Sequence, residues 1–201
     1  MLVVGAGGHG KSIVSVLLAC GTPVAGVLDD GPERQGGQVQ GVPVLGPVED
    51  LDRYPGRQAV IGLGDNAQRR AVAERFPAVE WVRVIHPGVY LNPTASVGPG
   101  TVVFPGAIIG ADAAIGAHVI VSGHTTIGHD TTLHDYVQVA PGVQVAGGVL
   151  VEEGAMLGIG SIVCPSLRIG AWATLGAGAV AVRDLPAGCV AFGMPARPRV
   201  R

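Results

Sequence analysis

Residues 127–145 read IGHDTTLHDYVQVAPGVQV, and an aliphatic residue recurs in this stretch at every sixth position. The spacing continues in both directions without an insertion, and all fifteen members of the series are Leu, Ile or Val: Leu91, Val97, Val103, Ile109, Ile115, Val121, Ile127, Leu133, Val139, Val145, Val151, Leu157, Val163, Ile169 and Leu175. The residue four positions after each of them is mostly small or β-branched. Because side chains two apart in a strand share a face, this residue and the next aliphatic one can both point inward. Each hexad therefore predicts one strand and one corner, and the series predicts a solenoid.

The composition agrees with a narrow, strand-rich core. Glycine accounts for 33 of 201 residues, whereas the aromatic residues are only 3 Phe, 2 Trp and 3 Tyr in a chain that is 48% hydrophobic. The apolar mass is therefore mainly aliphatic, which favours buried strands. The chain is too apolar and too weakly charged to be disordered, and its glycines lack the three-residue period of collagen.

Charge, hydropathy and cysteine usage exclude several classes of protein. The net charge is −2, so we expect no general attraction to nucleic acid or to an anionic membrane. We find no signal peptide and no apolar run near the ~18 residues of a membrane span. Cys20, Cys164 and Cys189 are odd in number and widely spaced, which indicates no disulfide framework. We therefore expect a cytoplasmic protein.

Charge also divides the chain into parts. Residues 1–86 carry 8 basic and 9 acidic side chains, residues 87–184 carry 2 and 6, and residues 185–201 carry three arginines and no acid. In the first part, apolar strands at residues 2–4, 24–28 and 59–63 alternate with helices at residues 12–19 and up to Arg75. We therefore predict a small α/β domain at 1–86, a repeat domain at 87–184 and a C-terminal tail at 185–201.

The first strand leads into a glycine-rich loop. Gly5, Gly7 and Gly10 have the spacing of a dinucleotide fingerprint, and acidic residues follow about 20 positions later. One interpretation is an NAD-binding domain, although 86 residues are only about half of a dinucleotide fold. The other is a pocket that holds the pyrophosphate of another nucleotide at a helix N-terminus.

Histidines supply the candidate chemistry of the repeat. We number each hexad from its aliphatic residue. His118 and His124 then occupy the fourth position of their hexads, His129 occupies the third and His134 the second. His86 lies outside the repeat and precedes a proline at the predicted domain boundary. His129 is followed by Asp130 at a predicted corner. A neutral imidazole suits general base catalysis, and a neighbouring carboxylate can fix its tautomer.

The repeat resembles that of the hexapeptide-repeat acyltransferases, which implies a left-handed parallel β-helix of about five coils. The whole chain is similar to the two-domain sugar O-acyltransferase family, also described as sialic-acid-O-acetyltransferase-like, to which the nucleotide-sugar 4-amino N-acetyltransferases belong. The similar segments are residues 5–11, 28–30, 61–66 with Arg69, 85–87, 129–130, 139–142, 146–149 and 193–196. The resemblance implies a Rossmann-like first domain, acetyl-CoA as co-substrate and no metal.

The resemblance also assigns roles at the acetyl-transfer site. His129 corresponds to the catalytic base and Asp130 to its acidic partner. Gly147, eighteen residues or one coil after His129, corresponds to a glycine whose amide meets the thioester carbonyl. Gly158, Ile159 and Ala177 correspond to residues that line the pantetheine groove with backbone groups. In the family this groove lies between subunits of a homotrimer.

The resemblance makes the first domain a nucleotide-sugar pocket. The residues implied in substrate binding are Gly8, His9, Gly10, Lys11, Asp29, Asp30, Gly64 and Asn66. Where some relatives carry Asn and His near the amino sugar, this chain has Ser122 and Gln138. Gln138 cannot titrate, which leaves the identity of the acceptor open. A solvated turn is the alternative interpretation of Asp29 and Asp30.

The function expected is acetyl-CoA-dependent N-acetylation of the 4-amino group of a nucleotide-linked 4-amino-4,6-dideoxy sugar. O-acetylation of a sugar such as sialic acid would use the same groups. A metal lyase resembling γ-type carbonic anhydrases is a third interpretation, since His124 and His129 have the required spacing, but Gly88 stands where the third ligand belongs. The arginines at 197, 199 and 201 either contact coenzyme A phosphates or belong to a frayed end.

Overall fold

A computed structural model of the chain describes residues 1–199. The chain divides into two compact units, Met1–Pro87 and a second that begins at Gly88. The division lies one residue from the expected boundary. Within the described part of the chain, no helix is long and apolar enough to cross a membrane.

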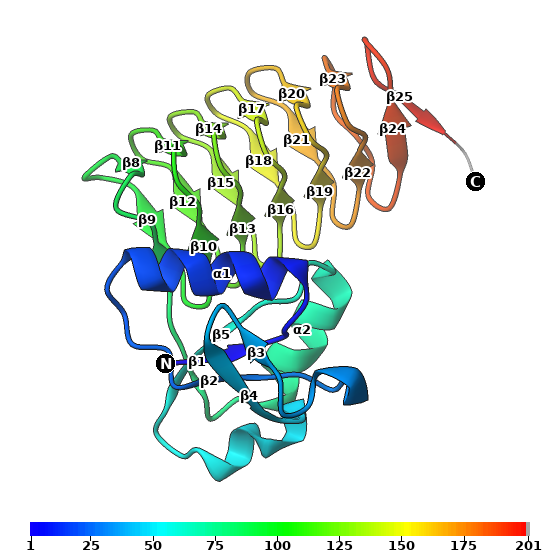
Figure 1. Ribbon diagram of the computed structural model, residues 1–201. Helices are drawn as coiled ribbons and strands as arrows, with labels where there is room; N and C mark the ends of the chain where they lie inside the picture. Colours follow the sequence, from blue (N-terminus) through cyan, green and yellow to red (C-terminus); the bar gives the residue numbers. More distant parts are fainter. Residues whose placement is uncertain (200–201) are drawn as a thin grey trace. The chain divides into compact units, whose positions relative to one another are not determined.

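The first unit is a mostly parallel sheet with the strand order β3-β4-β2-β1-β5-β6. Only the pair β3 and β4 is antiparallel. Its elements in chain order are β1 (Leu2–Val4), α1 (Gly8–Ala19), β2 (Gly26–Leu28), η1 (Pro32–Arg34), β3 (Gln38–Val39), β4 (Val42–Gly46), η2 (Val48–Arg53), β5 (Gln58–Ile61), α2 (Asn66–Arg75), β6 (Glu80–Trp81) and β7 (Val84–Ile85). The alternation of strand and helix predicted for this half is present (Figure 1). Helix α1 begins four residues earlier than expected, inside the glycine-rich loop.

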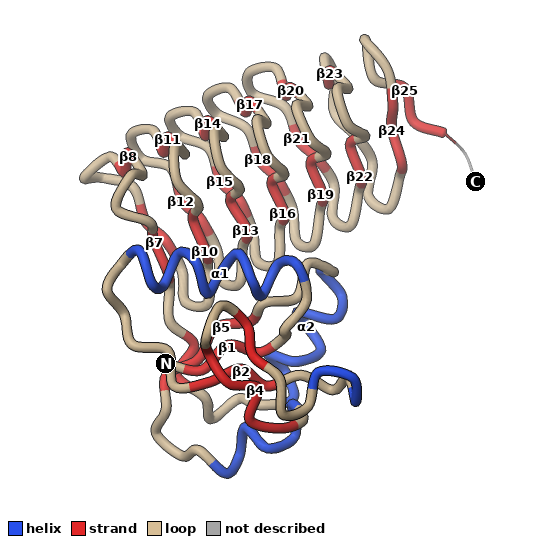
Figure 2. The backbone as a smooth tube through the Cα atoms, in the orientation of Figure 1, coloured by secondary structure: helices blue, strands red, loops and turns tan. Residues whose placement is uncertain are grey.

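The second unit is a parallel β-helix. From β8 to β23, strands of two residues follow one another every six residues, separated by short turns (Figure 2). They are β8 (Tyr90–Leu91), β9 (Ser96–Val97), β10 (Val102–Val103), β11 (Ile108–Ile109), β12 (Ala114–Ile115), β13 (Ile120–Val121), β14 (Thr126–Ile127), β15 (Thr132–Leu133), β16 (Gln138–Val139), β17 (Gln144–Val145), β18 (Leu150–Val151), β19 (Met156–Leu157), β20 (Ile162–Val163), β21 (Arg168–Ile169), β22 (Thr174–Leu175) and β23 (Val180–Ala181). Each strand from β8 to β20 pairs in parallel with the strand three further along, as Ile127 pairs with Val145, so eighteen residues form one coil.

Three sheets form the walls of this prism. We name them by their first strands in the second unit: the β8 sheet (β8-β11-β14-β17-β20-β23), the β9 sheet (β9-β12-β15-β18-β21) and the β10 sheet (β10-β13-β16-β19-β22-β24-β25). The chain passes from the β8 sheet to the β9 sheet at the His129 corner and from the β9 sheet to the β10 sheet at the Asp135 corner. It returns to the β8 sheet at the Ile159 corner.

The interior is built as the period of six predicts. The aliphatic residues Ile127 and Leu133 and the small or β-branched Thr125 and Thr131 are 0 or 1% exposed. Thr131 donates its hydroxyl hydrogen to the Ala146 carbonyl at 2.9 Å, which satisfies the polar atom inside the apolar core. The first and fifth positions of each hexad therefore point inward, and the remaining positions are available for function.

The fourth position of each hexad forms the corner. From residue 100 to residue 178 every residue at this position has a positive φ. Seven of them are not glycine: Asp112, His118, His124, Asp130, Tyr136, Ser166 and Trp172. The left-handed conformation costs a non-glycine residue about 1 kcal/mol, and Asn and Asp tolerate it best. This geometry fixes where the carboxylate of Asp130 (φ 55°) stands.

The described part of the C-terminal segment belongs to the prism and is not frayed. Leu185 forms a bridge with Ile169 and is 2% exposed. Strand β24 (Val190–Phe192) pairs in parallel with β22, and β25 (Arg197–Arg199) pairs antiparallel with β24. The expected separate tail is therefore an extension of the β10 sheet, while Arg201 lies outside the described residues.

Candidate active site

His129 and Asp130 form a hydrogen-bonded pair at the His129 corner. Nδ1 of His129 lies 2.7 Å from Oδ2 of Asp130, and the two side chains are 71% and 64% exposed. A carboxylate can only accept a hydrogen bond, so this contact places a proton on Nδ1 and leaves Nε2 of the neutral ring as an acceptor. The ring is thus oriented to remove a proton from a group that approaches Nε2.

Gly147 lies one coil further along the same corner, directly against the imidazole. A Cβ atom on Gly147 would lie 2.5 Å from Nε2 of His129. The Gly147 carbonyl accepts a hydrogen bond from Ser166 N at 3.0 Å, whereas its N–H has no acceptor within residues 1–199. The structure therefore brings the predicted base and a free amide donor together.

The other residues expected around acetyl-CoA lie at a different corner. Ile159 and Ala177 stack in successive coils at the Ile159 corner, where Ile159 is 62% exposed. The N–H of Gly158 donates to the Leu175 carbonyl, and its own carbonyl accepts from Ser161 N. A Cβ on Gly158 would lie 2.6 Å from Ala177 N, so the backbone of the next coil is close to it. The β8 sheet separates the two corners, so one chain does not bring these residues to His129.

Ser122 lies at the Ile159 corner, two coils before Gly158, and Gln138 lies on the outer side of the adjoining β10 sheet. Gln138 belongs to β16, and Ser122 directly follows β13, which pairs with β16 in parallel. Both side chains are half-buried. They lie close to one another but not at the His129 corner.

In the first unit, the predicted nucleotide-binding residues converge at one edge of the sheet. The strands β2, β1 and β5 are parallel neighbours, and their carboxyl ends lead into residues 29–30, 5–11 and 62–66. Gly5 (φ 106°) and Gly10 allow the loop to turn tightly, since a Cβ on Gly10 would collide with the Gly5 carbonyl. A Cβ on Gly62 would lie 2.7 Å from the Gly10 Cα, so the two loops are in contact. Ligands of open α/β sheets bind at this edge.

The start of α1 presents its amides toward this edge. Gly8 is exposed and has no atom within 4 Å of where its Cβ would be, and Lys11 is exposed one turn later. The first N–H groups of a helix have no partner within the helix and favour anions. This arrangement suits a phosphate at Gly8 and Gly10.

His9 belongs to the same loop and is partly buried. Burial, and then the charge of Arg69, lowers the pKa of His9 to about 4. His9 is therefore neutral near pH 7 and acts there as a hydrogen-bonding group without charge.

Asp29 and Asp30 accept hydrogen bonds from backbone N–H groups. Neither substrate binding nor a solvated turn, the two interpretations of the sequence, includes these bonds. Asp29 accepts hydrogen bonds from Ala6 N at 2.6 Å and Gly31 N at 2.8 Å, and its side chain is 16% exposed. Asp30 accepts from Val48 N at 2.8 Å. Asp29 is thus largely buried and ties the glycine-rich loop to the end of β2, whereas Asp30 is exposed.

Arg69 has a structural role that the sequence did not predict. It is 1% exposed and donates to the carbonyls of Leu63 and Gly64 and to Oδ1 of Asn66. It therefore shapes the turn that carries the predicted site residues Gly64 and Asn66. One of three arginines in a charged helix, Arg69 has no signal of this burial in the sequence.

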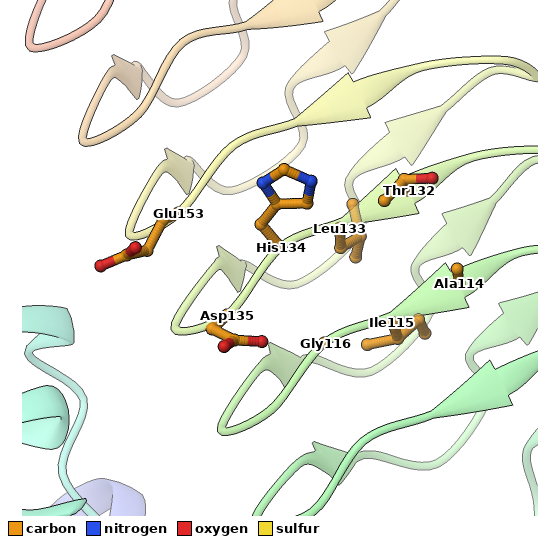
Figure 3. A pocket seen from close by; sticks show the side chains of 8 residues that line it. All are labelled: Ala114, Ile115, Gly116, Thr132, Leu133, His134, Asp135 and Glu153. Atoms are coloured by element: carbon orange, nitrogen blue, oxygen red, sulfur yellow. The ribbon is translucent and has the colours of Figure 1, made fainter. Parts of the chain in front are cut away.

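The remaining histidines of the repeat do not lie beside the pair of His129 and Asp130. His118 is buried, with its ring stacked on Tyr136 at 5.4 Å between centroids, and His124 packs against Gly106. His134 lines a cavity of about 350 Å³ on the β9 sheet, with Asp135 and Glu153 (Figure 3). Asp135 there accepts a hydrogen bond from Ala117 N at 2.7 Å. In residues 1–199, no three His, Cys, Asp or Glu side chains are grouped as metal ligands.

Part of the first unit matches a known family of domains. Residues 1–76 match the family model of the PglD N-terminal domain. Among curated proteins, the uncharacterized protein L142 of Acanthamoeba polyphaga mimivirus is 28% identical over 92 residues. These residues are 46% of this chain and 18% of the viral protein, so the match spans less than a fifth of that relative.

Two solved structures match this chain over almost its whole length. The perosamine N-acetyltransferase of Caulobacter crescentus, in complex with CoA and GDP-perosamine, is 35% identical with a TM-score of 0.93, and the match covers 100% of this chain and 96% of that one. The acetyltransferase domain of PglB from Neisseria gonorrhoeae, in complex with acetyl coenzyme A, is 34% identical with a TM-score of 0.93 and 98% coverage of both chains. The second unit accordingly has the fold of a left-handed β-helix. The chain belongs to the hexapeptide-repeat acyltransferases, in the branch of the nucleotide-sugar 4-amino N-acetyltransferases.

Proposed function

We propose that the protein transfers the acetyl group of acetyl-CoA to the 4-amino group of a 4-amino-4,6-dideoxy sugar linked to a nucleotide. The observation that carries the proposal is the arrangement at the His129 corner. A base oriented by Asp130 stands beside the unpaired amide of Gly147. The Caulobacter relative, which binds CoA and GDP-perosamine, supports the same substrate classes.

The reaction follows from the positions of these groups. The amine nitrogen attacks the thioester carbonyl carbon while Nε2 of His129 takes a proton from the amine. Asp130 stabilises the imidazolium that results, and the Gly147 N–H donates to the developing oxyanion. The carbon–sulfur bond then breaks, the amide forms, and the thiolate of CoA leaves and takes the proton from His129.

We further propose that the active site is shared between subunits of a homotrimer. The residues at the His129 corner and those at the Ile159 corner flank the β8 sheet of one chain, so a partner is needed to bring the two sets together. The outer side of the β8 sheet carries exposed apolar residues that a partner would cover: Tyr90, Ile108, Ile162 and Val182. Ile159 and Ala177 of one subunit would then hold the pantetheine arm beside His129 of the next.

The first unit would bind the nucleotide. Its phosphates would lie at the amides of Gly8 and Gly10 with Lys11, and neutral His9, Gly64 and Asn66 would line the same edge. Asp29 and Asp30 would act by holding the loops that form the pocket, and Ser122 and Gln138 would contact the sugar. The three cysteines are free, which supports a reducing, cytoplasmic location.

Two measurements test this function. In a thermal-shift screen, acetyl-CoA and the correct nucleotide sugar should each raise the midpoint, because a ligand of the native state stabilises it. In a product assay by mass spectrometry, a nucleotide-linked 4-amino sugar should gain one acetyl group. The 4-hydroxy analogue should gain none, and its acetylation would favour the O-acetyltransferase alternative instead.

A further inference from the structure

His124 has an exposed imidazole on the outside of the prism. One edge of the ring lies over Gly106, where a Cβ would be 2.9 Å from Nδ1 and 3.0 Å from Cε1 of His124. Neither ring nitrogen has a hydrogen-bond or ion-pair partner in residues 1–199. The imidazole is therefore supported on one side, and its nitrogens are available to a ligand.

The backbone fixes the position of this imidazole. His124 has a φ of 56°, the left-handed conformation of its corner position. Its N–H donates to the Pro105 carbonyl at 3.3 Å, and its carbonyl accepts from Nε2 of Gln144 at 3.4 Å. The residues at the same corner position in other coils are glycines with positive φ: Gly106, Gly142, Gly160 and Gly178. His124 thus adds a side chain to a corner that folds without one.

His124 stands at the Ile159 corner and at nearly the same height as His129. Within one chain the β8 sheet separates the two histidines. His124 precedes His129 by five residues of an eighteen-residue coil, which is about 1 Å along the prism axis at the usual strand spacing. Ile159 follows His129 by thirty residues and therefore lies about 8 Å further along the axis. The residue of this corner that is level with His129 is thus His124 rather than Ile159.

The proposed trimer brings these two corners together. The inference rests on the proposed function, in which the Ile159 corner of one subunit faces the His129 corner of the next. A pantetheine arm that contacts both Ile159 and Ala177, which stack in successive coils, runs along the prisms. In a cyclic trimer whose axis has that direction, every residue keeps its height from one subunit to the next. His124 of one subunit then lies level with His129 of the next, on the side of the acetyl group away from the arm.

An amine acceptor needs a second base at this place. An aliphatic amine is largely an ammonium ion near pH 7, whereas only the neutral amine has the electron pair that attacks the thioester. His129 takes a proton during the attack and returns it to the thiolate, so the first proton of the ammonium must leave through another group. Residues 104–108, 122–126 and 140–144 form this corner in three successive coils, and their sole titratable side chain is His124.

We propose that His124 of one subunit is a second catalytic base in the acetyl-transfer site of the next. Its neutral imidazole accepts a proton from the ammonium group of the acceptor, and the electron pair of the broken N–H bond stays on nitrogen. The imidazolium of His124 then gives this proton to water. His129 takes a further proton as the nitrogen attacks. One ammonium and one thioester thus become one amide, one thiol and one proton released to solvent.

His124→Gly tests this role with the residue that the same corner position carries in neighbouring coils. At pH 7 we expect kcat/KM for the amino-sugar nucleotide to fall about 100-fold, while the KM for acetyl-CoA stays within about twofold. Because the variant can use only the neutral amine, its kcat/KM should rise about tenfold per pH unit below the amine pKa, where the wild type is level. His124→Asn, which suits the left-handed corner but does not titrate, should behave likewise. His134→Ala is the histidine control and should keep the rate and the pH profile of the wild type.

Mixed trimers test whether the two histidines of one site come from different subunits. Chains with His124→Gly and chains with His129→Ala are expressed together with different affinity tags, and trimers that carry both tags are purified. Each mixed trimer has one site of three in which both histidines are intact, so we expect about a third of the wild-type activity. No recovery in mixed trimers would overturn the proposal.

Two further outcomes separate this inference from the proposed function. If the wild type acetylates no nucleotide-linked amino sugar, the proposed function fails and the role of His124 fails with it. If the wild type is active and His124→Gly matches it, or loses activity with the pH profile of the wild type, only the role of His124 is overturned. Thermal unfolding and size-exclusion chromatography of His124→Gly show that a loss of activity is not a loss of fold or assembly.

Discussion

The imidazole of His129 occupies the space that a side chain on Gly147 would need. A Cβ on Gly147 would lie 2.5 Å from Nε2 and 2.6 Å from Cε1 of His129. Gly147 does not have a positive φ, and Ala111 and Ala171 occupy the same hexad position in other coils. The backbone therefore accepts alanine there, and only the imidazole must move.

Gly147→Ala should consequently displace the base without unfolding the prism. A shift of about 1 Å in a catalytic group can lower kcat by about 100-fold, and we expect a loss of that size. Steady-state kinetics and circular dichroism check this. As a matched control, Ala111→Gly exchanges the same residue types two coils earlier and should retain kcat. Wild-type turnover in Gly147→Ala would show that Nε2 does not need its present position.

His129→Ala should remove the general base. We expect kcat to fall by about 10² to 10⁴, the usual contribution of such a group, while acetyl-CoA binding and the thermal midpoint stay close to wild type. Stopped assays with the amino-sugar nucleotide measure the loss. His134→Ala, an exposed histidine on the β9 sheet, is the matched control and should stay active. Full activity of His129→Ala would exclude His129 as the base.

Asp130→Asn tests the orienting carboxylate without straining the corner. Asn accepts the left-handed conformation that Asp130 has, with φ of 55°, so the backbone should be retained. Loss of the charge-assisted hydrogen bond to Nδ1 should lower kcat by about 10- to 100-fold. Asp112→Asn changes the same hexad position one coil earlier, with φ of 57°, and should be neutral. Equal effects of the two substitutions would contradict a specific role for Asp130.

The neutral state of His9 predicts an acid-sensitive stability. The pKa of His9 is lowered to about 4 in the fold, from 6.5 unperturbed, so the unfolded chain binds the extra proton between these values. Stability therefore falls as the pH drops from about 6.5 toward 4. Between pH 7 and 4.5, the wild type should lose about 2 kcal/mol more unfolding free energy than His9→Gln. Urea unfolding measures this, and parallel pH curves for the two proteins would refute a buried neutral His9.

The interior and the stacking of the β-helix could be predicted because the repeat is periodic. The aliphatic period of six assigned Ile127 and Leu133 to the interior, and the coil length of eighteen residues placed Gly147 over His129. In contrast, the aliphatic period does not indicate where the prism ends. Ala181 replaces the expected aliphatic residue, and β24 follows at a different interval, yet both continue the prism because their backbones pair with the coil before.

Contacts between distant segments could not be predicted in the first unit. Asp29 bonds to Ala6, and Arg69 bonds to the turn at Leu63 and Gly64, although nothing in their neighbouring sequence distinguishes them from exposed charges. Their burial depends on which strands lie side by side. A role in positioning loops, rather than in contacting ligand, is visible only when those strands are in place.

The sequence by itself determined the winding of the repeat, because a solenoid is set by interactions between residues at one fixed spacing. It also determined that His129 and Asp130 stand at a corner. Only the tertiary structure decided that the residues expected around acetyl-CoA divide between two corners, and that His124 stands at the second of them. These relationships depend on the register between strands, which places side chains in space through backbone hydrogen bonds that the order of residues alone does not specify.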